Sequence, residues 1–265
     1  MTRAVVVGLG RVEPDLVTGV LGDDIDFVAE PTEDDLAVAE GAIVRADAVV
    51  DAAFLDRTPR MRVLARTGVG TDLVDLDAAA ARGIAVVVTP GTGTRAVAEG
   101  VLAHTLALVK RVAPLTALVS GGRWADRDSS GPIGDLDGAT IGIIGYGRIG
   151  RRVGELSAAF GMRVLAYDLY APPPAEVACD DLDAALAALE SGQISGVGLD
   201  VFEIEPPVHH PVFDHPSVSL TPHLMGLTRK ATAATFADAA QGVVDVLAGR
   251  RPAAVANPTP ESASR

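Results

Sequence analysis

Three glycines at a fixed spacing form the clearest chemical motif of this sequence. Gly145, Gly147 and Gly150 follow the apolar run TIGII at 140–144 and open a segment of helical period that ends near Phe160. In such a loop the first glycine permits a tight turn, the second lets a pyrophosphate approach the backbone, and the third lets the helix pack on the strand. The spacing therefore predicts a dinucleotide-binding loop at a helix N-terminus.

The acidic partner of this loop is Asp168, which lies 23 residues after Gly145 at the end of the strand pattern MRVLAY. A carboxylate there accepts hydrogen bonds from both ribose hydroxyls and repels a 2′-phosphate, so NAD is favoured over NADP as the cofactor. Arg148 and Ile149, between the second and third glycines, complete the predicted NAD site. No metal site is predicted.

An earlier loop, VVVGLGRVE, also follows a strand pattern, but Glu13 stands where the third glycine would fall. A side chain there blocks close packing of a helix on the strand. We therefore interpret this loop as an ordinary turn between a strand and a helix.

The bulk composition excludes several kinds of partner. The chain has 265 residues, a formal net charge of -13 and a pI near 4.7, and this charge repels nucleic acid and anionic lipid surfaces. Its single cysteine, Cys179, cannot form an internal disulfide, which suits a reducing compartment. No apolar run approaches the roughly 20 residues of a membrane span. We expect a cytoplasmic protein that binds neither nucleic acid nor membrane.

Alternating strand and helix patterns must position the glycine loop. Apolar β-rich runs lie at 3–8, 46–50, 62–66 and 84–88, with segments of helical period between them. This alternation is typical of a parallel sheet covered by helices. A long helix is predicted at 96–112, and a second α/β pattern starts at Ala139. The predicted fold class is α/β, with two Rossmann-like or flavodoxin-like parallel-sheet domains.

The predicted domain boundaries follow from these patterns. Residues 1–98 form a first, substrate-binding domain, which a C-terminal helix at 227–258 completes. Residues 99–226 form the NAD-binding domain, and 259–265 are a tail.

Together with the glycine loop, further stretches of the chain resemble the D-2-hydroxyacid dehydrogenase family, which includes phosphoglycerate, glycerate and formate dehydrogenases. Four further stretches, in the order usual for the family, carry the likeness: ARTGVGTDLVDLDAAAARGIAVVVTPG, AVAEGVLAHTLALV, SGVGLDVFEIEPP and LTPHLMG. The resemblance implies NAD-dependent hydride transfer between a small D-2-hydroxy acid and its 2-keto acid, in a homodimer.

The same resemblance assigns roles to three residues. Asp200 matches the residue that holds the nicotinamide carboxamide, His223 matches the catalytic histidine, and Glu205 matches the acid that pairs with it. The chemistry is sound, because a base must remove the hydroxyl proton as hydride leaves the carbon, and imidazole titrates in the required range. The other four histidines, His104, His209, His210 and His215, are predicted to be surface or core polar residues.

The loop TGVGTD, which follows the strand pattern RVLAR, has glycines that expose backbone N–H groups. In the family such a loop grips the substrate carboxylate, so Val69, Gly70 and Thr71 are predicted to bind substrate. A plain turn between a strand and a helix is the alternative.

The NAD-binding domain is short. Between Asp168 and Asp200 there is room for one helix, so only four strands are predicted, at 140–144, 163–168, 194–201 and 217–220. The family has two more strands here, in about 50 residues, and the joint falls between Ala178 and Asp181. The strands beside the missing segment either pair directly or leave a gap, and the shortening is either natural or engineered.

The missing segment also contains the substrate-binding arginine of the family, and the resemblance therefore implies impaired activity. The leading hypothesis is an NAD-dependent 2-hydroxyacid dehydrogenase of reduced turnover. The alternative is a non-catalytic NAD(H)-binding sensor or interaction protein on the same fold. A scaffold that binds no nucleotide is a third possibility.

Overall fold

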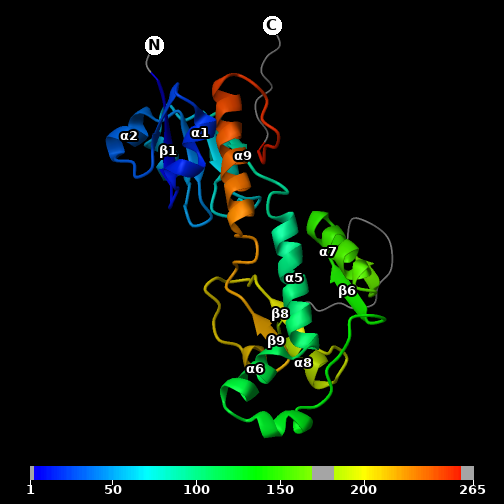
Figure 1. Cartoon of the computed structure of the whole chain (residues 1–265). Coiled ribbons are helices and arrows are strands. Elements are labelled where there is room, and N and C mark those ends of the chain that lie inside the picture. Colours follow the sequence, from blue (N-terminus) through cyan, green and yellow to red (C-terminus); the bar gives the residue numbers. More distant parts are fainter. Residues whose placement is uncertain (1–2, 169–181, 258–265) are drawn as a thin grey trace. The chain divides into compact units, whose positions relative to one another are not determined.

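The computed structural model describes residues 3–168 and 182–257, and the chain divides into two compact units (Figure 1). Unit 1 comprises Met1–Thr92 and Arg229–Arg265, and unit 2 comprises Gly93–Thr228. The sequence patterns place the corresponding boundaries at 98 and 226. Both units contain parallel strands and helices, so the predicted α/β class is confirmed.

Unit 1 is built on a five-stranded parallel sheet with the order β2-β1-β3-β4-β5. Its strands are β1 (Ala4–Leu9), β2 (Ile25–Val28), β3 (Gly41–Val44), β4 (Val63–Arg66) and β5 (Ala85–Val87). Its helices are α1 (Thr18–Leu21), α2 (Glu33–Val38), α3 (Ala52–Asp56), α4 (Leu76–Ala81) and α9 (Arg229–Leu247), with a 3₁₀ helix at Pro14–Leu16. The central strands β3 and β4 are buried throughout, because helices cover both faces of the sheet.

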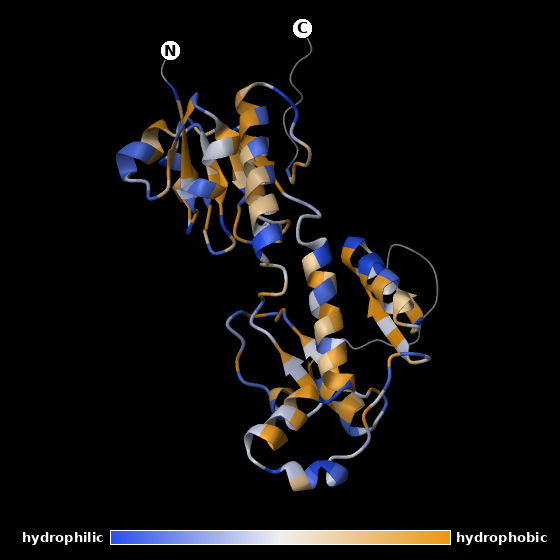
Figure 2. Cartoon of the chain, viewed as in Figure 1, coloured by the Kyte–Doolittle hydropathy of each residue, from blue (hydrophilic) through white to orange (hydrophobic). Residues whose placement is uncertain are grey.

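Apolar cores fill both faces of this sheet. Adjacent strand residues point to opposite faces, so Leu64 packs with Leu55 of α3 on one face, while Val63 packs with Val243 of α9 on the other. In Figure 2 the strands of this unit are largely hydrophobic, whereas its helices mix hydrophobic and hydrophilic residues. Burial of this apolar surface is the main source of the unit's stability.

The centre of the sheet differs from the sequence prediction. Residues 46–50, predicted as a strand, form a loop in which only Val50 makes an isolated bridge. The strands β2 and β3 were not predicted. β3 opens with Gly41, where a Cβ would lie 3.0 Å from Val243 and 3.1 Å from Val63. Close packing of α9 requires a small residue there. Gly and Ala have low strand propensity, so a prediction from propensity misses this strand.

The C-terminal helix is shorter than the predicted 227–258. α9 ends at Leu247, and the chain then returns to the sheet, where Val255 forms an antiparallel bridge with Val87. The side-chain amide of Asn257 hydrogen-bonds the backbone of the same edge strand. The segment after the helix therefore covers part of the exposed edge of β5.

Unit 2 contains the glycine loop and the predicted catalytic residues. Its helices are α5 (Thr94–Val109), α6 (Val112–Ser120), α7 (Arg148–Ala159) and α8 (Leu182–Glu190), with 3₁₀ helices at Trp124–Ser129 and Pro211–Asp214. Its strands are β6 (Thr140–Ile144), β7 (Arg163–Tyr167), β8 (Val197–Leu199) and β9 (Val218–Leu220). β8 is thus shorter than the predicted 194–201.

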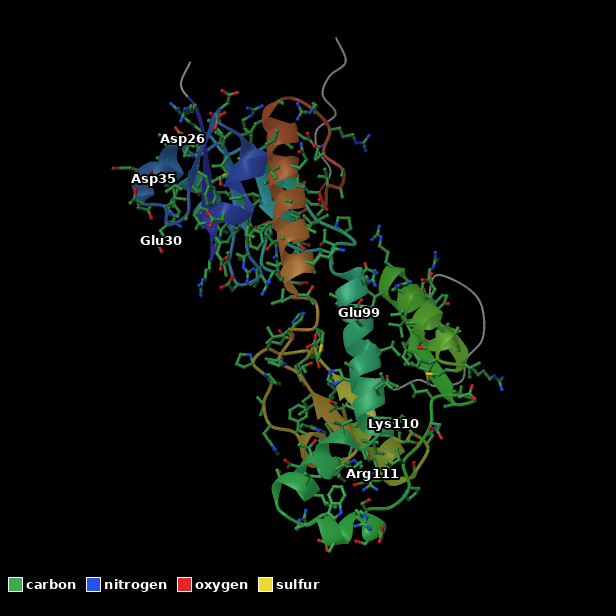
Figure 3. All side chains as sticks on the ribbon, in the orientation of Figure 1. Asp26, Glu30, Asp35, Glu99, Lys110 and Arg111 are labelled. Atoms are coloured by element: carbon green, nitrogen blue, oxygen red, sulfur yellow. The ribbon has the colours of Figure 1, made fainter. Side chains whose placement is uncertain are left out.

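The long helix predicted at 96–112 is broken. Arg111, which follows Lys110 (Figure 3), has a φ of +53° and separates α5 from α6. In the part of the chain that the structure describes, no single helix is long and apolar enough to cross a membrane. The pair α5 and α6, bent by 58°, meets that length and composition test only when counted together.

The sheet of unit 2 is split. β6 pairs with β7 and β8 pairs with β9, both in parallel, and no described strand joins β6 to β8. Of the two arrangements expected from the sequence, the described strands therefore show a gap between β6 and β8 rather than direct pairing. Helix α5 contacts both halves, because Leu102 packs with Ile143 of β6 while Leu108 lies against Gly196, next to β8. The predicted joint at 178–181, with Cys179, lies outside the described residues.

Candidate active site

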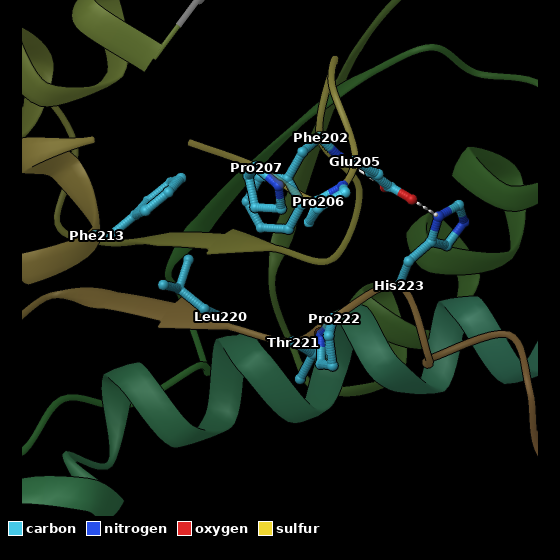
Figure 4. A pocket seen from close by; sticks show the side chains of 9 residues that line it. All are labelled: Phe202, Glu205, Pro206, Pro207, Phe213, Leu220, Thr221, Pro222 and His223. Atoms are coloured by element: carbon cyan, nitrogen blue, oxygen red, sulfur yellow. Dashed lines mark hydrogen bonds and ion pairs between the residues drawn. The ribbon is translucent and has the colours of Figure 1, made fainter. Parts of the chain in front are cut away.

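Glu205 and His223 come from the loops that follow β8 and β9, and the parallel pairing of these strands places both loops at the same edge. Nδ1 of His223 lies 2.9 Å from Oε2 of Glu205 (Figure 4). Oε1 of Glu205 accepts a hydrogen bond from the N–H of Phe202 at 3.1 Å. The hydrogen bond with His223, followed by that from Phe202, holds the pKa of Glu205 below its ordinary value.

The protonation of His223 follows from its partner. An ionised carboxylate is only an acceptor, so Nδ1 of His223 must carry the proton that it donates to Glu205. Nε2, on the opposite side of the ring, makes no hydrogen bond to the described part of the chain. The imidazole is thus oriented with one nitrogen held and the other available to a ligand.

The backbone of His223 is strained. Its φ is +54°, a left-handed conformation that only Arg111 shares among the described non-glycine residues. This region costs an ordinary residue about 1–2 kcal/mol, and such strain persists where neighbouring contacts hold it. Here the carboxylate of Asp200 accepts the N–H groups of Leu224 at 3.0 Å and Met225 at 3.1 Å, immediately after the histidine.

Asp200 follows β8 directly. Its Oδ1 accepts the hydroxyl of Thr221 at 2.6 Å and the N–H of Leu224, with a longer contact of 3.4 Å to the N–H of Met225. Within the described residues its Oδ2 accepts a hydrogen bond only from Met225. Because a carboxylate oxygen has room for a second donor, Oδ2 is free to accept from an amide such as the predicted carboxamide. Asp200 therefore fixes the backbone beside His223 and keeps one acceptor available.

Glu205 and His223 border a cavity of about 430 Å³. Most of its wall is apolar, while Glu205, Thr221 and His223 supply polar groups (Figure 4). The apolar lining residues are Phe202, Pro206, Pro207, Phe213, Leu220 and Pro222. The size and the few polar groups are typical of a site for a small organic molecule.

The glycine loop between β6 and α7 has the conformation that pyrophosphate binding needs. Gly145 has a φ of +84°, and Gly147 is the N-cap of α7. A Cβ added at either position would have no atom within 4 Å, so the space before the helix is open. At Gly150 a Cβ would collide with the carbonyl oxygen of Gly145, so the close approach of helix and loop requires glycine there.

The remaining predicted NAD residues lie around this loop. Asp168 follows β7 and accepts the N–H of Tyr146 at 2.7 Å, which ties the acid to the glycine loop. Arg148 and Ile149 form the first turn of α7, where backbone N–H groups have no partner within the helix. These residues fit the pyrophosphate and adenosine ribose of a dinucleotide.

In unit 1 the predicted substrate loop offers donors. The backbone N–H groups of Val69, Gly70 and Thr71 make no hydrogen bond within the described residues, and the side chain of Val69 is exposed. The loop therefore has the free donors that an anion requires.

A residue beside this loop was missed in the sequence analysis. Arg66, the last residue of β4, is only 8% exposed, and its Nε and Nη1 atoms have no hydrogen-bond partner in the described chain. Arg45, which follows β3, also has a buried Nε without a partner. Burial, and next the charge of Arg45, lower the pKa of Arg66. The signal was available, because Arg66 is a charged residue at the carboxyl end of the strand pattern RVLAR.

The other histidines behave differently from one another. His209 and His210 form ion-pair contacts of 3.2 Å with Asp214 and Asp183, both exposed carboxylates, as expected of surface groups. His104, by contrast, is buried and hydrogen-bonded on both ring nitrogens.

The sequence profile of the D-isomer-specific 2-hydroxyacid dehydrogenases, catalytic domain, matches residues 9–257. The chain belongs to this family. The predicted family is therefore confirmed.

Relatives within the 2-hydroxyacid dehydrogenase family include the D-3-phosphoglycerate dehydrogenase of Mycobacterium tuberculosis, 32% identical over 94% of this chain and 58% of the relative. The human D-3-phosphoglycerate dehydrogenase is 29% identical over 84% of this chain and 51% of the relative. The chain thus spans little more than half the length of these relatives. The mycobacterial alignment covers 308 positions although this chain has only 265 residues, so this chain has gaps relative to that protein within the aligned region.

Solved structures have the same fold as this chain. The TT0316 protein of Thermus thermophilus is 28% identical, with a TM-score of 0.77 over 95% of this chain and 99% of that protein. The NADPH-dependent glyoxylate/hydroxypyruvate reductase of Sinorhizobium meliloti is 24% identical, with a TM-score of 0.82 over 97% of this chain and 99% of that protein.

Proposed function

We propose that this chain is an NAD-dependent oxidoreductase that interconverts a small D-2-hydroxy acid and its 2-keto acid. The observation that carries the proposal is the hydrogen-bonded pair of His223 and Glu205 at the wall of the 430 Å³ cavity. An oriented imidazole with a free nitrogen is the group that such a reaction needs as proton donor and acceptor. The homodimer and the cytoplasmic location expected from the sequence belong to this proposal as well.

Different residues of the chain supply the different parts of the reaction. NADH, when bound, supplies the hydride that reduces the carbonyl carbon. His223 donates the Nε2 proton to the carbonyl oxygen in the reductive direction and takes it back in the oxidative direction. Glu205 holds Nδ1 and stabilises the charged imidazolium. The N-terminus of α7 and the carboxylate of Asp168 hold the pyrophosphate and the ribose of the cofactor.

The substrate is proposed to be an anion. The N–H groups of Val69, Gly70 and Thr71 have no hydrogen-bond partner within the described residues. Together with the half-buried Arg45 and the buried Arg66, they are donors that suit a carboxylate or a phosphate group. In the family, the segment that is missing here carries the motif with the substrate-binding arginine. That motif is absent from this sequence. A lost charge-assisted contact weakens transition-state binding by several kcal/mol, so we propose reduced turnover.

The alternative proposal is a non-catalytic NAD(H) sensor. The split sheet of unit 2 favours it, because a core divided into two-stranded halves is less able to hold a precise reacting geometry. The intact pair of His223 and Glu205 opposes it, because a protein that only binds nucleotide has no use for an oriented acid–base group.

The first test is an NADH titration of the purified chain, followed by nicotinamide fluorescence, with Gly147→Asp as the matched variant. A Cβ at this position meets no atom within 4 Å, and the aspartate places a carboxylate where the pyrophosphate approaches. We expect saturable binding that Gly147→Asp abolishes. Absence of binding by the native chain would overturn the proposal.

Turnover is then measured with NADH and glyoxylate, hydroxypyruvate or phosphohydroxypyruvate, with His223→Gln as the control. Slow oxidation of NADH that His223→Gln removes supports the dehydrogenase. Tight NADH binding without turnover of any of these acids favours the sensor.

A further inference from the structure

His104 is a buried histidine that lies in α5, outside the catalytic loops, yet it connects to them. It is 8% exposed. Its Nδ1 lies 2.7 Å from the hydroxyl of Ser219 and its Nε2 lies 3.1 Å from the hydroxyl of Thr221. Both partners belong to β9 or directly follow it, on the segment that leads to His223. A buried group with both nitrogens engaged has a defined orientation.

Hydrogen-bond accounting assigns the direction of each contact for a neutral His104 ring. A threonine hydroxyl has one proton, and Thr221 gives it to Oδ1 of Asp200 at 2.6 Å, the shorter of its two contacts. The hydroxyl oxygen must therefore accept from Nε2–H of His104. Nδ1 of the neutral ring then accepts from the hydroxyl of Ser219. The network is satisfied by a single tautomer of His104, with the proton on Nε2.

The network ends at the strained backbone of the active site. Asp200, which accepts from Thr221, also accepts the N–H groups of Leu224 and Met225, immediately after His223. The chain of contacts thus runs from α5 through two side chains to the residues that hold the left-handed histidine. A group that keeps the Thr221 proton directed at Asp200 also keeps Asp200 directed at this backbone.

The packing of α5 on β8 brings His104 into reach. A Cβ at Gly198, in β8, would lie 2.8 Å from Cβ of His104, so the helix can approach at this point only because the strand has glycine. Gly198 and His104 therefore form a matched pair, in which the small residue makes room for the ring.

We propose that His104 is a positioning residue of the active site, which acts through Thr221 and Asp200 to hold His223 in its productive conformation. The inference deepens the proposed function and rests on it for any effect on turnover. The placement of the His223 ring, however, is measurable without turnover.

The first experiment therefore uses nitrogen-detected NMR of the histidine rings at neutral pH in the native chain. We expect His104 as the Nε2–H tautomer and His223 with a hydrogen-bonded proton on Nδ1. A His104 ring with its proton on Nδ1 would overturn the proposal, whatever the chain does with NADH.

Five variants, one of them a control, then test the connection. His104→Leu and Thr221→Val remove the contact, whereas His104→Gln retains a donor near the position of Nε2 and Thr221→Ser retains the hydroxyl. Thr105→Val is the matched control on α5, because its hydroxyl donates only to the Val101 carbonyl within the helix. We expect the Nδ1–H signal of His223 to shift or vanish in the first two variants and to persist in the other three.

In a chain that turns over, His104→Leu and Thr221→Val should each lower kcat about tenfold, with KM for the keto acid changed less than twofold, because misplacement of a catalytic group affects the chemical step. The double variant should be no worse than either single variant. Unchanged His223 signals in a folded His104→Leu or Thr221→Val protein would contradict the inference. Failure of turnover in the native chain, with the NMR results as expected, would count against the proposed function alone.

Discussion

Nδ1 of His223 and Oε2 of Glu205 are 2.9 Å apart, although the residues are 18 positions apart in the chain. The contact exists because β8 and β9 are parallel neighbours, which puts the loops that follow them side by side. Everything that we propose about the reaction depends on this pair.

Replacing His223 by Gln should lower kcat by about 10²- to 10⁴-fold, the usual contribution of a general acid or base. The NADH dissociation constant should not change, because the side chain does not contact the glycine loop. Stopped-flow turnover and the fluorescence titration measure the two quantities. His209→Gln, at an exposed histidine outside the cavity, is the control and should retain native activity. Native kcat in His223→Gln would remove the histidine from the mechanism.

The carboxyl group of Glu205 should titrate below the ordinary range of glutamate. Its pKa is lowered by the hydrogen bond with His223 and by that from the N–H of Phe202. A depressed folded-state pKa means that the stabilising contribution is present above the unfolded pKa and is lost as the pH falls through the folded value. A carbon NMR titration of the Glu205 carboxyl group should show a higher midpoint in His223→Ala than in the native chain. Equal midpoints would show that the contact is too weak to matter.

Gly150→Ala should weaken NADH binding by at least about tenfold and destabilise unit 2 by about 1–3 kcal/mol, the usual cost of overpacking. The added Cβ would collide with the carbonyl oxygen of Gly145, so the glycine loop must move. Gly142→Ala, in β6 with no atom within 4 Å of its Cβ, is the matched control. Thermal unfolding and the NADH titration distinguish the two variants, and equal behaviour would contradict the packing argument.

Asp168→Asn should raise the affinity for NADPH relative to NADH by about tenfold, or about 1.4 kcal/mol. The amide oxygen still accepts the N–H of Tyr146, but the negative charge that repels a 2′-phosphate is gone. Parallel titrations with the two cofactors measure the ratio. A ratio that stays at the native value would mean that Asp168 does not face the ribose.

Arg66→Met should stabilise the ligand-free chain by about 1 kcal/mol, because it removes a buried cation whose Nε and Nη1 have no hydrogen-bond partner among the described residues. The proposed anion site predicts that phosphohydroxypyruvate raises the melting temperature of the native chain and that Arg66→Met loses this increase. Arg57→Met is the control, since Arg57 is exposed and paired with Glu33. An Arg66→Met protein that is destabilised and still responds to the ligand would show that the arginine is structural.

The sequence alone determined the family, the α/β class and the residues of the nucleotide loop, because these depend on local spacing. A strand, three glycines, a helix and an acid are recognisable without knowing what they pack against. Prediction from local spacing missed β3. The glycine at position 41 is required by close packing against Val243, a residue more than two hundred positions away in the chain.

Only the tertiary structure decided how the shortened domain is arranged and what holds His223. The sequence was compatible with direct pairing of β6 and β8 and with a gap between them. In the fold these strands do not pair, and α5 contacts both two-stranded sheets of unit 2. The fold also buries Arg66 and places His104 in hydrogen-bond contact with Thr221, whose hydroxyl donates to Asp200. Hydrogen bonds and burial depend on distances in space, and residues far apart in the chain carry no local pattern that records those distances.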